Sequence, residues 1–163
     1  MEIIEAIRNR RSTRSFKPDP VPRKVLEELL DACRWVPSSQ NTQATELAIL
    51  GGKVMEEYKT RLAEKVKAKV EPNPDIPNIE PYGEYLQRAI ASREAIDRHQ
   101  FPPGTEDLDA KRGAYFIKGG SFYDAPNGII MYADKALGDK ILINAGILAQ
   151  SICLCALNYG LGT

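Results

Sequence analysis

The residues best suited to chemistry lie in one short basic segment near the N-terminus. Three guanidinium groups and two hydroxyls follow one another there: Arg10, Arg11, Ser12, Thr13 and Arg14. An arginine presents a planar fork of donors that grips a phosphate through two hydrogen bonds, and hydroxyls complete the shell around such an oxyanion. The segment therefore predicts a binding site for an anionic group.

A second polar cluster follows downstream and is the natural companion of the first. It consists of small polar residues after a proline: Pro37, Ser38, Ser39, Gln40 and Asn41. We predict that the two clusters hold one anionic cofactor. Taken alone, each has a simpler interpretation, because the basic segment could be a solvated turn or a nucleic-acid patch, and the second cluster a turn that ends a helix.

Composition removes several classes of site and partner. The chain has 22 basic and 22 acidic residues, so no global field attracts it to nucleic acid or to a membrane. One histidine and three scattered cysteines argue against a histidine triad, a metal site and a disulfide framework. No uninterrupted apolar run is long enough for a membrane helix, and acids stand near the N-terminus where a signal peptide carries bases. We expect a cytoplasmic protein.

Hydrophobic periodicity predicts six helices and two strands around these clusters. The expected helices cover residues 2–9, 22–35, 53–70, 84–98, 106–117 and 140–158, and the strands cover 46–50 and 128–133. Residues 140–158 are apolar almost all round, which is typical of a helix in a core or a subunit interface. The strand at 128–133 shows no polar alternation, so we expect it to be buried on both faces.

Finer packing expectations come from single residues. In the expected helix at 53–70, apolar residues occur every four positions from Val54 to Val70. We expect the face that carries these residues to pack on the core. Trp35 is expected in the core. Cys153 and Cys155 should face different sides of the last helix, and the cysteines should act as small buried hydrophobes.

The middle of the chain, residues 71–123, is where we expect substrate selection. Four prolines lie in residues 71–83, which predicts an extended loop. Seven aromatic residues then gather between positions 82 and 123. They could pack a core or form an aromatic pocket above a cofactor, and the sequence does not decide between the two.

Four motifs in order resemble the FMN-dependent nitroreductase family. They are Glu5-Ala6-Ile7 with Arg10 to Arg14; Pro37 to Gln43; Asp124-Ala125-Pro126; and Asn144-Ala145-Gly146 through to Gly160-Leu161-Gly162-Thr163. The resemblance covers most of the chain outside roughly residues 60–112. It implies an α+β fold with a central, mainly antiparallel sheet flanked by helices, built as an intertwined homodimer with FMN at the interface.

The resemblance also implies a role for each cluster. Arg10, Arg11, Ser12 and Arg14 would contact the FMN phosphate, ribityl chain and pyrimidine edge. Residues of the second cluster would reach the flavin bound mainly by the other subunit: Pro37, Ser38, Ser39 and Asn41. The implied reaction is a ping-pong transfer of hydride from NADH or NADPH to the flavin and on to a nitroaromatic, quinone or similar small acceptor.

In such an enzyme the chemistry belongs to the flavin, so no catalytic side chain is expected beyond an electrostatic role for Arg14. The same fold and cofactor could instead serve reductive dehalogenation, enone reduction or flavin fragmentation. A non-enzymatic alternative is a nucleic-acid-binding domain that uses residues 8–14.

The sequence departs from the family pattern at two places. Ala44-Thr45 stands where the family usually has Pro-Trp, which changes the wall expected beside the flavin. Relatives continue beyond the position of Thr163, so we expect residues 1–163 to be a single FMN-binding domain that lacks its C-terminal segment.

Overall fold

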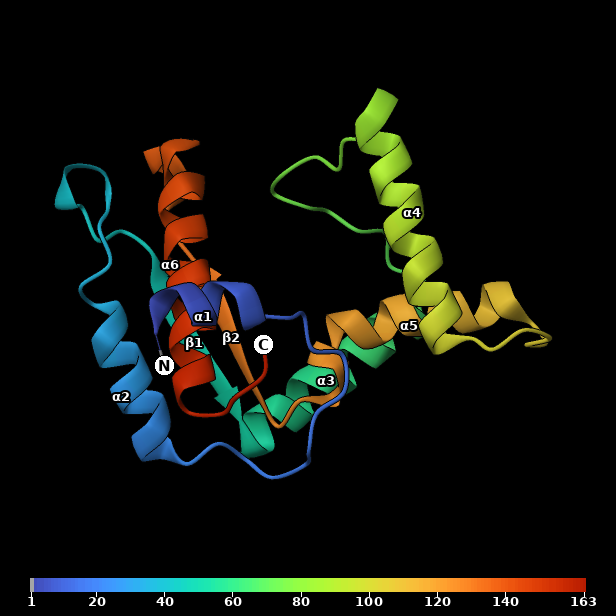
Figure 1. Ribbon diagram of the computed structural model, residues 1–163, viewed down its shortest axis with the longest axis horizontal. Coiled ribbons are helices and arrows are strands. Elements are labelled where there is room, and N and C mark those ends of the chain that lie inside the picture. Colours follow the sequence, from blue (N-terminus) through green and yellow to red (C-terminus); the bar gives the residue numbers. More distant parts are fainter. Residues whose placement is uncertain (1) are drawn as a thin grey trace. The chain divides into compact units, whose positions relative to one another are not determined.

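All the helices and strands expected from the sequence are present in the computed structural model, which describes residues 2–163 (Figure 1). In chain order they are α1 (Ile3–Asn9), α2 (Arg23–Cys33), β1 (Glu46–Gly51), α3 (Gly52–Lys67), α4 (Gly83–Gln100), α5 (Leu108–Gly120), β2 (Asn127–Tyr132) and α6 (Lys140–Asn158). Short 3-10 turns lie at Ser39–Asn41, Phe122–Asp124 and Lys135–Leu137. The chain forms two compact units, residues 2–62 with Gly119–Thr163 (unit 1) and Ala63–Lys118 (unit 2).

The sheet of unit 1 is an antiparallel pair of β1 and β2. Glu46 lies opposite Tyr132 at one end and Gly51 opposite Asn127 at the other. The Tyr132 hydroxyl donates to Glu46 Oε2 at 2.9 Å, which secures the outer end of the pairing. The Asn127 side chain secures the other end, because it accepts from Val21 N at 2.8 Å and donates to the Leu50 carbonyl at 3.3 Å.

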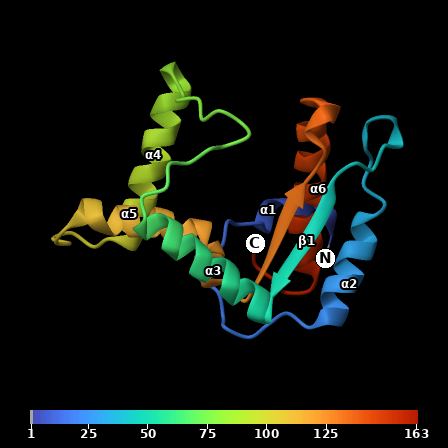
Figure 2. The ribbon, with the colours of Figure 1, turned by 180° about the vertical axis from the view of Figure 1, so that it is seen from behind.

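Helices α2 and α6 cover one face of this sheet, and α1 packs on α6 (Figures 1 and 2). The core between them is small and apolar: Leu29, Cys33, Ile152 and Ala156 are buried, and Leu47, Ile129 and Met131 pack against them from the sheet. Because the covering helices lie on that one face, the expectation that residues 128–133 are buried on both faces is wrong. Gly128 is the only buried residue of β2, and Tyr132 is half exposed.

Helix α6 combines a core-facing side with an exposed apolar side. It places Asn144, Ile152 and Ala156 in the buried set, yet Ile143 remains 68% exposed and Leu142 is also exposed. By length and composition alone α6 is apolar enough to cross a membrane, as the core helices of soluble proteins also can be. A search for uninterrupted apolar runs does not find this helix, because the polar residues Asn144 and Gln150 lie within it.

Two packing expectations are wrong, each for an identifiable reason. Trp35 is 88% exposed rather than in the core, because α2 ends at Cys33 and the chain turns away. In α3 the buried residue is Met55, whereas Val54 is exposed. Tyr58 lies four residues after Val54 and three residues after Met55. Both spacings place two side chains on the same face of a helix, so the sequence pattern alone does not decide whether Val54 or Met55 faces the core.

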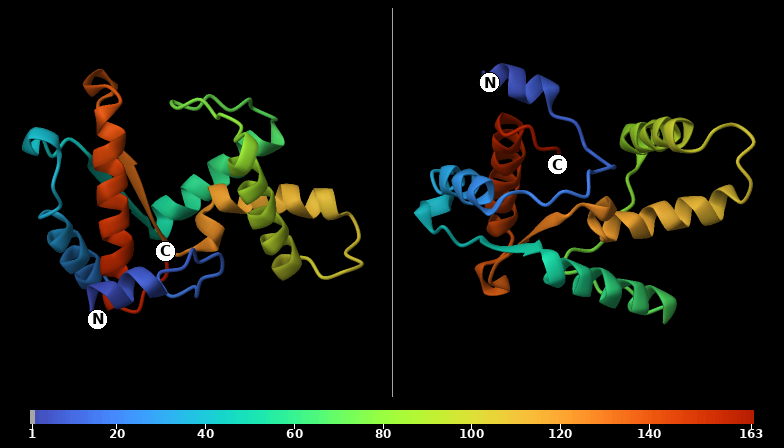
Figure 3. Two further views of the ribbon diagram at one scale, coloured as in Figure 1. Left: turned by 45° about the horizontal axis from the view of Figure 1, so that its top comes forward. Right: turned by 90° about the horizontal axis from the view of Figure 1, so that it is seen from below.

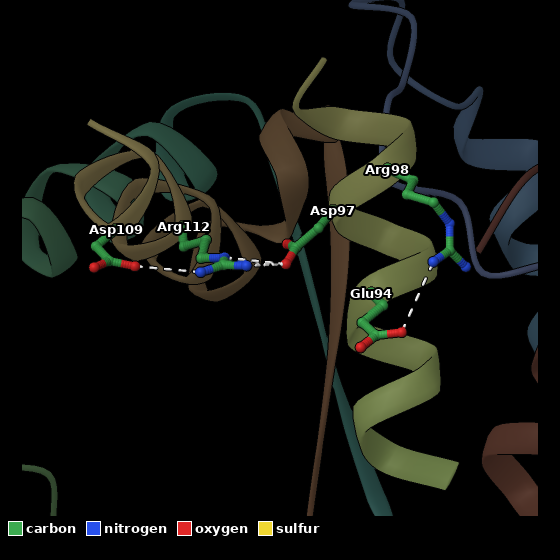
Figure 4. A network of polar contacts seen from close by, with 5 residues as sticks. All are labelled: Glu94, Asp97, Arg98, Asp109 and Arg112. Atoms are coloured by element: carbon green, nitrogen blue, oxygen red, sulfur yellow. Dashed lines mark hydrogen bonds and ion pairs between the residues drawn. The ribbon is translucent and has the colours of Figure 1, made fainter. Parts of the chain in front are cut away.

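Unit 2 is held together without a buried residue among Ala63–Lys118. It contains the end of α3, all of α4 and most of α5. The loop at residues 101–107 connects α4 to α5 (Figure 3). Arg112 joins them, because its guanidinium donates to Asp97 on α4 and to Asp109 within α5 at 3.2 Å (Figure 4). A second pair, Glu94 with Arg98, lies along α4 at 3.8 Å. Asp97 is half-buried in this network.

Candidate functional site

A cavity of about 700 Å³ opens in unit 1 between the basic segment, β2 and α6. Its walls are mostly apolar, with Leu26 and Leu29 from α2, Ile129 and Met131 from β2, and Ile152 from α6. Residues 13–17 and the chain end at 160–163 close its rim. A hollow of this size and character is typical of a site for a flat, partly apolar ligand.

Arg14 brings positive charge to this cavity. It is half-buried, and its Cζ atom lies 4.9 Å from the centroid of the Tyr123 ring. Its Nη1 also donates to the Thr13 carbonyl at 3.2 Å. Across residues 2–163 Arg14 makes no ion pair, so its charge is not neutralised by a carboxylate.

Three other members of the predicted basic cluster, Arg10, Arg11 and Ser12, lie outside the cavity wall. Arg10 follows the last turn of α1, where its N–H donates to the Ala6 carbonyl at 3.0 Å. Arg11 is exposed and folds back, its Nη1 donating to the carbonyls of Arg8 and Arg10 at 2.6 and 2.9 Å. Ser12 is exposed as well. Of the predicted cluster, the structure therefore presents Thr13 and Arg14 to the cavity, and Arg10, Arg11 and Ser12 are not part of its lining.

The end of the chain fixes the basic segment in place. Thr13 N–H donates to the Thr163 carbonyl at 2.8 Å. Gly162 permits this approach, because a Cβ there would lie 2.6 Å from Thr13 Oγ1. Gly160, with φ of +69°, ends α6 in the left-handed conformation as its sequence position predicts.

The second predicted cluster forms a tight turn held by its own polar groups. Ser38 Oγ accepts from Gln43 N at 3.0 Å, and Asn41 Oδ1 accepts from Gln43 Nε2 at 3.0 Å. Gln40, Asn41 and Gln43 all have left-handed φ, between 47° and 55°. Such backbone is unfavourable for residues other than glycine and persists where surrounding contacts hold it. Asn41 is exposed at the tip of the turn.

Asn144 anchors that turn to α6. Its side chain is buried, and its Oδ1 accepts from Ser39 N at 3.1 Å. Together with Pro37, Ser38 and Ser39 it lines a shallow hollow of about 380 Å³. The sequence contained a signal for this role that we did not use: Asn144 is an amide near the start of an almost entirely apolar helix.

The two predicted clusters do not meet within one chain. Arg14 lines the large cavity, whereas Pro37, Ser38 and Ser39 line the shallow hollow, and the two have no residue in common. Figures 1 and 2 show the clusters on different sides of α6. A ligand that touches both would therefore need a second copy of the chain.

Only some aromatic residues of the middle region take one of the two expected roles. Phe122 and Tyr123 line the cavity, and Phe122 packs against Tyr58 with ring centroids 5.5 Å apart. By contrast Tyr82 and Phe116 are more than 70% exposed, at 74% and 72%. The cavity position of Tyr123 is a second feature that sequence reasoning did not single out.

The environment of Cys33 makes it unsuited to acid–base chemistry. Burial, with a smaller contribution from neighbouring Cys155, raises the pKa of the Cys33 thiol to about 11. Cys33 is therefore protonated at neutral pH and a weak nucleophile. Cys155 packs on the core that contains Cys33 while Cys153 lines the cavity, so the expectation that the pair faces different sides of α6 is confirmed.

Known proteins resemble this chain along nearly its full length. The model of the nitroreductase family matches residues 7–163. A chloronitrobenzene nitroreductase of Comamonas testosteroni is 30% identical over 99% of the chain and 71% of that protein. A nitrobenzene nitroreductase of Ectopseudomonas oleovorans gives the same identity and coverage.

The fold is also found among solved structures. The FMN-dependent nitroreductase NfnB from Mycobacterium smegmatis, solved in complex with NADPH, superimposes with a TM-score of 0.85. The match covers 96% of this chain and 70% of that one at 23% identity. At this identity the likeness concerns the fold, and it confirms the expected arrangement of helices on an antiparallel sheet.

Proposed function

The chain belongs to the nitroreductase family, and from this premise we propose that it is an FMN-dependent oxidoreductase that uses NADH or NADPH to reduce nitroaromatic, quinone or similar acceptors. Similar proteins are named for nitrobenzene and chloronitrobenzene reduction, and the solved relative NfnB is FMN-dependent. When bound, FMN supplies the hydride-accepting and hydride-donating chemistry. The protein's own residues bind, orient and shield it.

The observation that carries this proposal is a set of cationic donors without acidic partners. Arg10, Arg11 and Arg14 make no ion pair across residues 2–163, and the guanidinium groups of Arg11 and Arg14 donate to neutral backbone carbonyls. A phosphate dianion suits such donors, because charge-assisted bonds to it are stronger than those to carbonyls. The apolar cavity beside Arg14 suits a flat ring system, so the residues present fit FMN.

Within this proposal each predicted residue has a task. Arg10, which is half-buried, and Arg11 and Ser12, which are exposed, would bind the phosphate and ribityl chain. Arg14 would place its charge near the pyrimidine edge of the ring. The turn containing Pro37, Ser38, Ser39 and Asn41 would contribute from a second copy of the chain.

We infer a homodimer from the same geometry. The two clusters line different hollows of one chain, so a shared ligand requires two copies. Exposed apolar residues lie on α6 and α1, among them Ile143 and Ile147, and Ile3, Ile4 and Ile7. Burying such side chains against a partner is favourable. A cytoplasmic site of action fits the three free thiols, which persist best in a reducing compartment.

Flavin binding and reduction by the full chain test the proposed function. We expect FMN to bind, its visible absorbance to bleach with NADH or NADPH without oxygen, and nitrobenzene to restore it. Arg10→Gln should weaken FMN binding by about tenfold or more, because a charge-assisted hydrogen bond is lost. Arg23→Gln on α2 is the matched control, since Arg23 is exposed and pairs with Glu27 instead. A chain that binds no FMN would overturn the proposal.

Sedimentation at several concentrations tests the dimer. Ile143→Glu should shift the full chain toward monomer, because it places a charge on the exposed apolar side of α6. Val54→Glu on α3 changes an equally apolar, exposed residue and should leave the sedimentation unchanged. A wild-type chain that remains monomeric in the presence of FMN would contradict the inference.

A further inference from the structure

Tyr123 meets Arg14 at the wall of the large cavity. The guanidinium carbon lies 4.9 Å from the ring centroid, which is within the range of a cation–π contact. We propose that Tyr123 is a positioning residue: its ring holds the Arg14 guanidinium in the orientation in which it meets the FMN ring system. This inference rests on the proposed function, because it assigns a task within that same site.

The type of contact matters for what Arg14 can still do. A carboxylate partner would occupy the N–H donors of a guanidinium and neutralise its charge. An aromatic ring contacts the flat face of the group instead, which leaves the in-plane donors and the positive charge available. Of those donors, Nη1 alone makes a hydrogen bond here, to the Thr13 carbonyl. The ring thus restricts Arg14 without using up its capacity to bind an anionic ligand.

The backbone that carries Tyr123 has an unusual conformation. Phe122, Tyr123 and Asp124 have φ of +57°, +52° and +63°, so three consecutive residues other than glycine are left-handed. This region is unfavourable for residues with a Cβ, and bulky aromatic residues rarely occupy it. Two of the three line the cavity. An unfavourable backbone maintained beside a cavity is typical of side chains whose direction has a function.

Contacts on both sides of the turn keep the ring in place. A Cβ at Gly119 would lie 3.2 Å from Tyr123 Oη, so glycine gives the ring room to lie against α5. On the other side the Phe122 ring packs so close to β2 that a Cβ at Gly128 would lie 3.0 Å from it. Ala125 N–H closes the turn by donating to the Phe122 carbonyl at 3.0 Å. These contacts limit the positions that the Tyr123 ring can take.

Substitutions that keep or remove the ring separate this role from general packing. In the full chain we expect Tyr123→Leu to raise the Kd for FMN by about 3- to 30-fold, in proportion to a lost cation–π contact. Tyr123→Phe keeps the ring and should stay within about threefold of wild type. The midpoint potential of bound flavin should become more negative in Tyr123→Leu and remain near wild type in Tyr123→Phe, because the displaced Arg14 charge no longer favours the reduced anion.

A double-mutant cycle identifies Arg14 as the residue through which Tyr123 acts. In an Arg14→Gln background, Tyr123→Leu should cause no further change in Kd or potential. Additive effects of the two changes, or equal effects of Tyr123→Phe and Tyr123→Leu, would overturn the inference. If Tyr123→Leu fails to fold, Gly119→Ala gives the same test by crowding the ring, and wild-type behaviour of that variant would overturn it. Failure of the wild type to bind FMN would instead refute the proposed function itself.

Discussion

The two units of the chain are held together by different forces. Unit 1 contains all the buried residues that residues 2–163 provide, and its sheet, α2 and α6 close around an apolar core. Unit 2 depends on the Arg112 network and on the edge-to-face pair of Phe101 and Tyr115, whose centroids are 6.3 Å apart. Apolar burial scales with area, whereas exposed ion pairs contribute little. The candidate cofactor residues therefore stand on a well-packed support, and most of the expected substrate-selecting region does not.

The largest difference between the units is expected when one apolar side chain is truncated in each of them. Met55→Ala should lower the free energy of unfolding by about 2–5 kcal/mol, because Met55 is 1% exposed and its loss leaves a cavity beside β2. Leu86→Ala on α4 should change it by only about 0.5 kcal/mol, since Leu86 is 40% exposed. Urea denaturation measures both. Equal losses for the two variants would contradict the distinction between the units.

A polar change inside the core of unit 1 has the next largest expected effect. Asn144→Leu removes the acceptor of the Ser39 N–H and should cost about 1–3 kcal/mol, even though it adds apolar surface. Hydrogen exchange should accelerate at Ser39. Asn144→Asp keeps an acceptor at the same position and should retain slow exchange there, and Gln150→Leu at an exposed position of α6 serves as the control.

The smallest effect is expected from the ion pairs of unit 2. Asp97→Asn weakens the contact that joins α4 to α5, so hydrogen exchange in these helices should increase, by up to about fivefold. The main unfolding transition of unit 1 should not move. Asp109→Asn is the matched control, because the Asp109 side chain is 98% exposed and pairs within its own helix. A large shift of the main transition in Asp97→Asn would show that unit 2 stabilises the core.

The sequence predicted the elements well because their signals are local. Helix α6 begins and ends at the expected residues, and β1 and β2 lie within one residue of theirs. The sequence could not predict which of two similar helix faces is buried, because this depends on the elements that pack against the helix in the fold. Met55 rather than Val54 is buried for this reason, and Trp35 is exposed because α2 ends before it.

The candidate site was predictable in its chemistry but not in its geometry. The residue types in the two clusters indicate an anionic cofactor, yet only the fold separates Arg14 from the turn that contains Ser38 and Ser39. The sequence marks Tyr123 only as one of seven aromatic residues that could form a pocket. Its contact with Arg14 could not be predicted, because it depends on three left-handed residues that no common sequence rule anticipates. Left-handed backbone at non-glycine residues is set by tertiary contacts rather than by local preference.

The buried amide of Asn144 has a consequence for how α6 chooses its place. A helix that is apolar on nearly every side buries a similar apolar area at any rotation about its own axis. Hydrophobic packing alone therefore does little to fix that rotation. The hydrogen bond between Asn144 and Ser39 changes this, because a rotation of α6 breaks it and leaves the Asn144 amide unsatisfied wherever it stays buried. A single side chain thereby selects one rotational setting of the longest helix in the described chain.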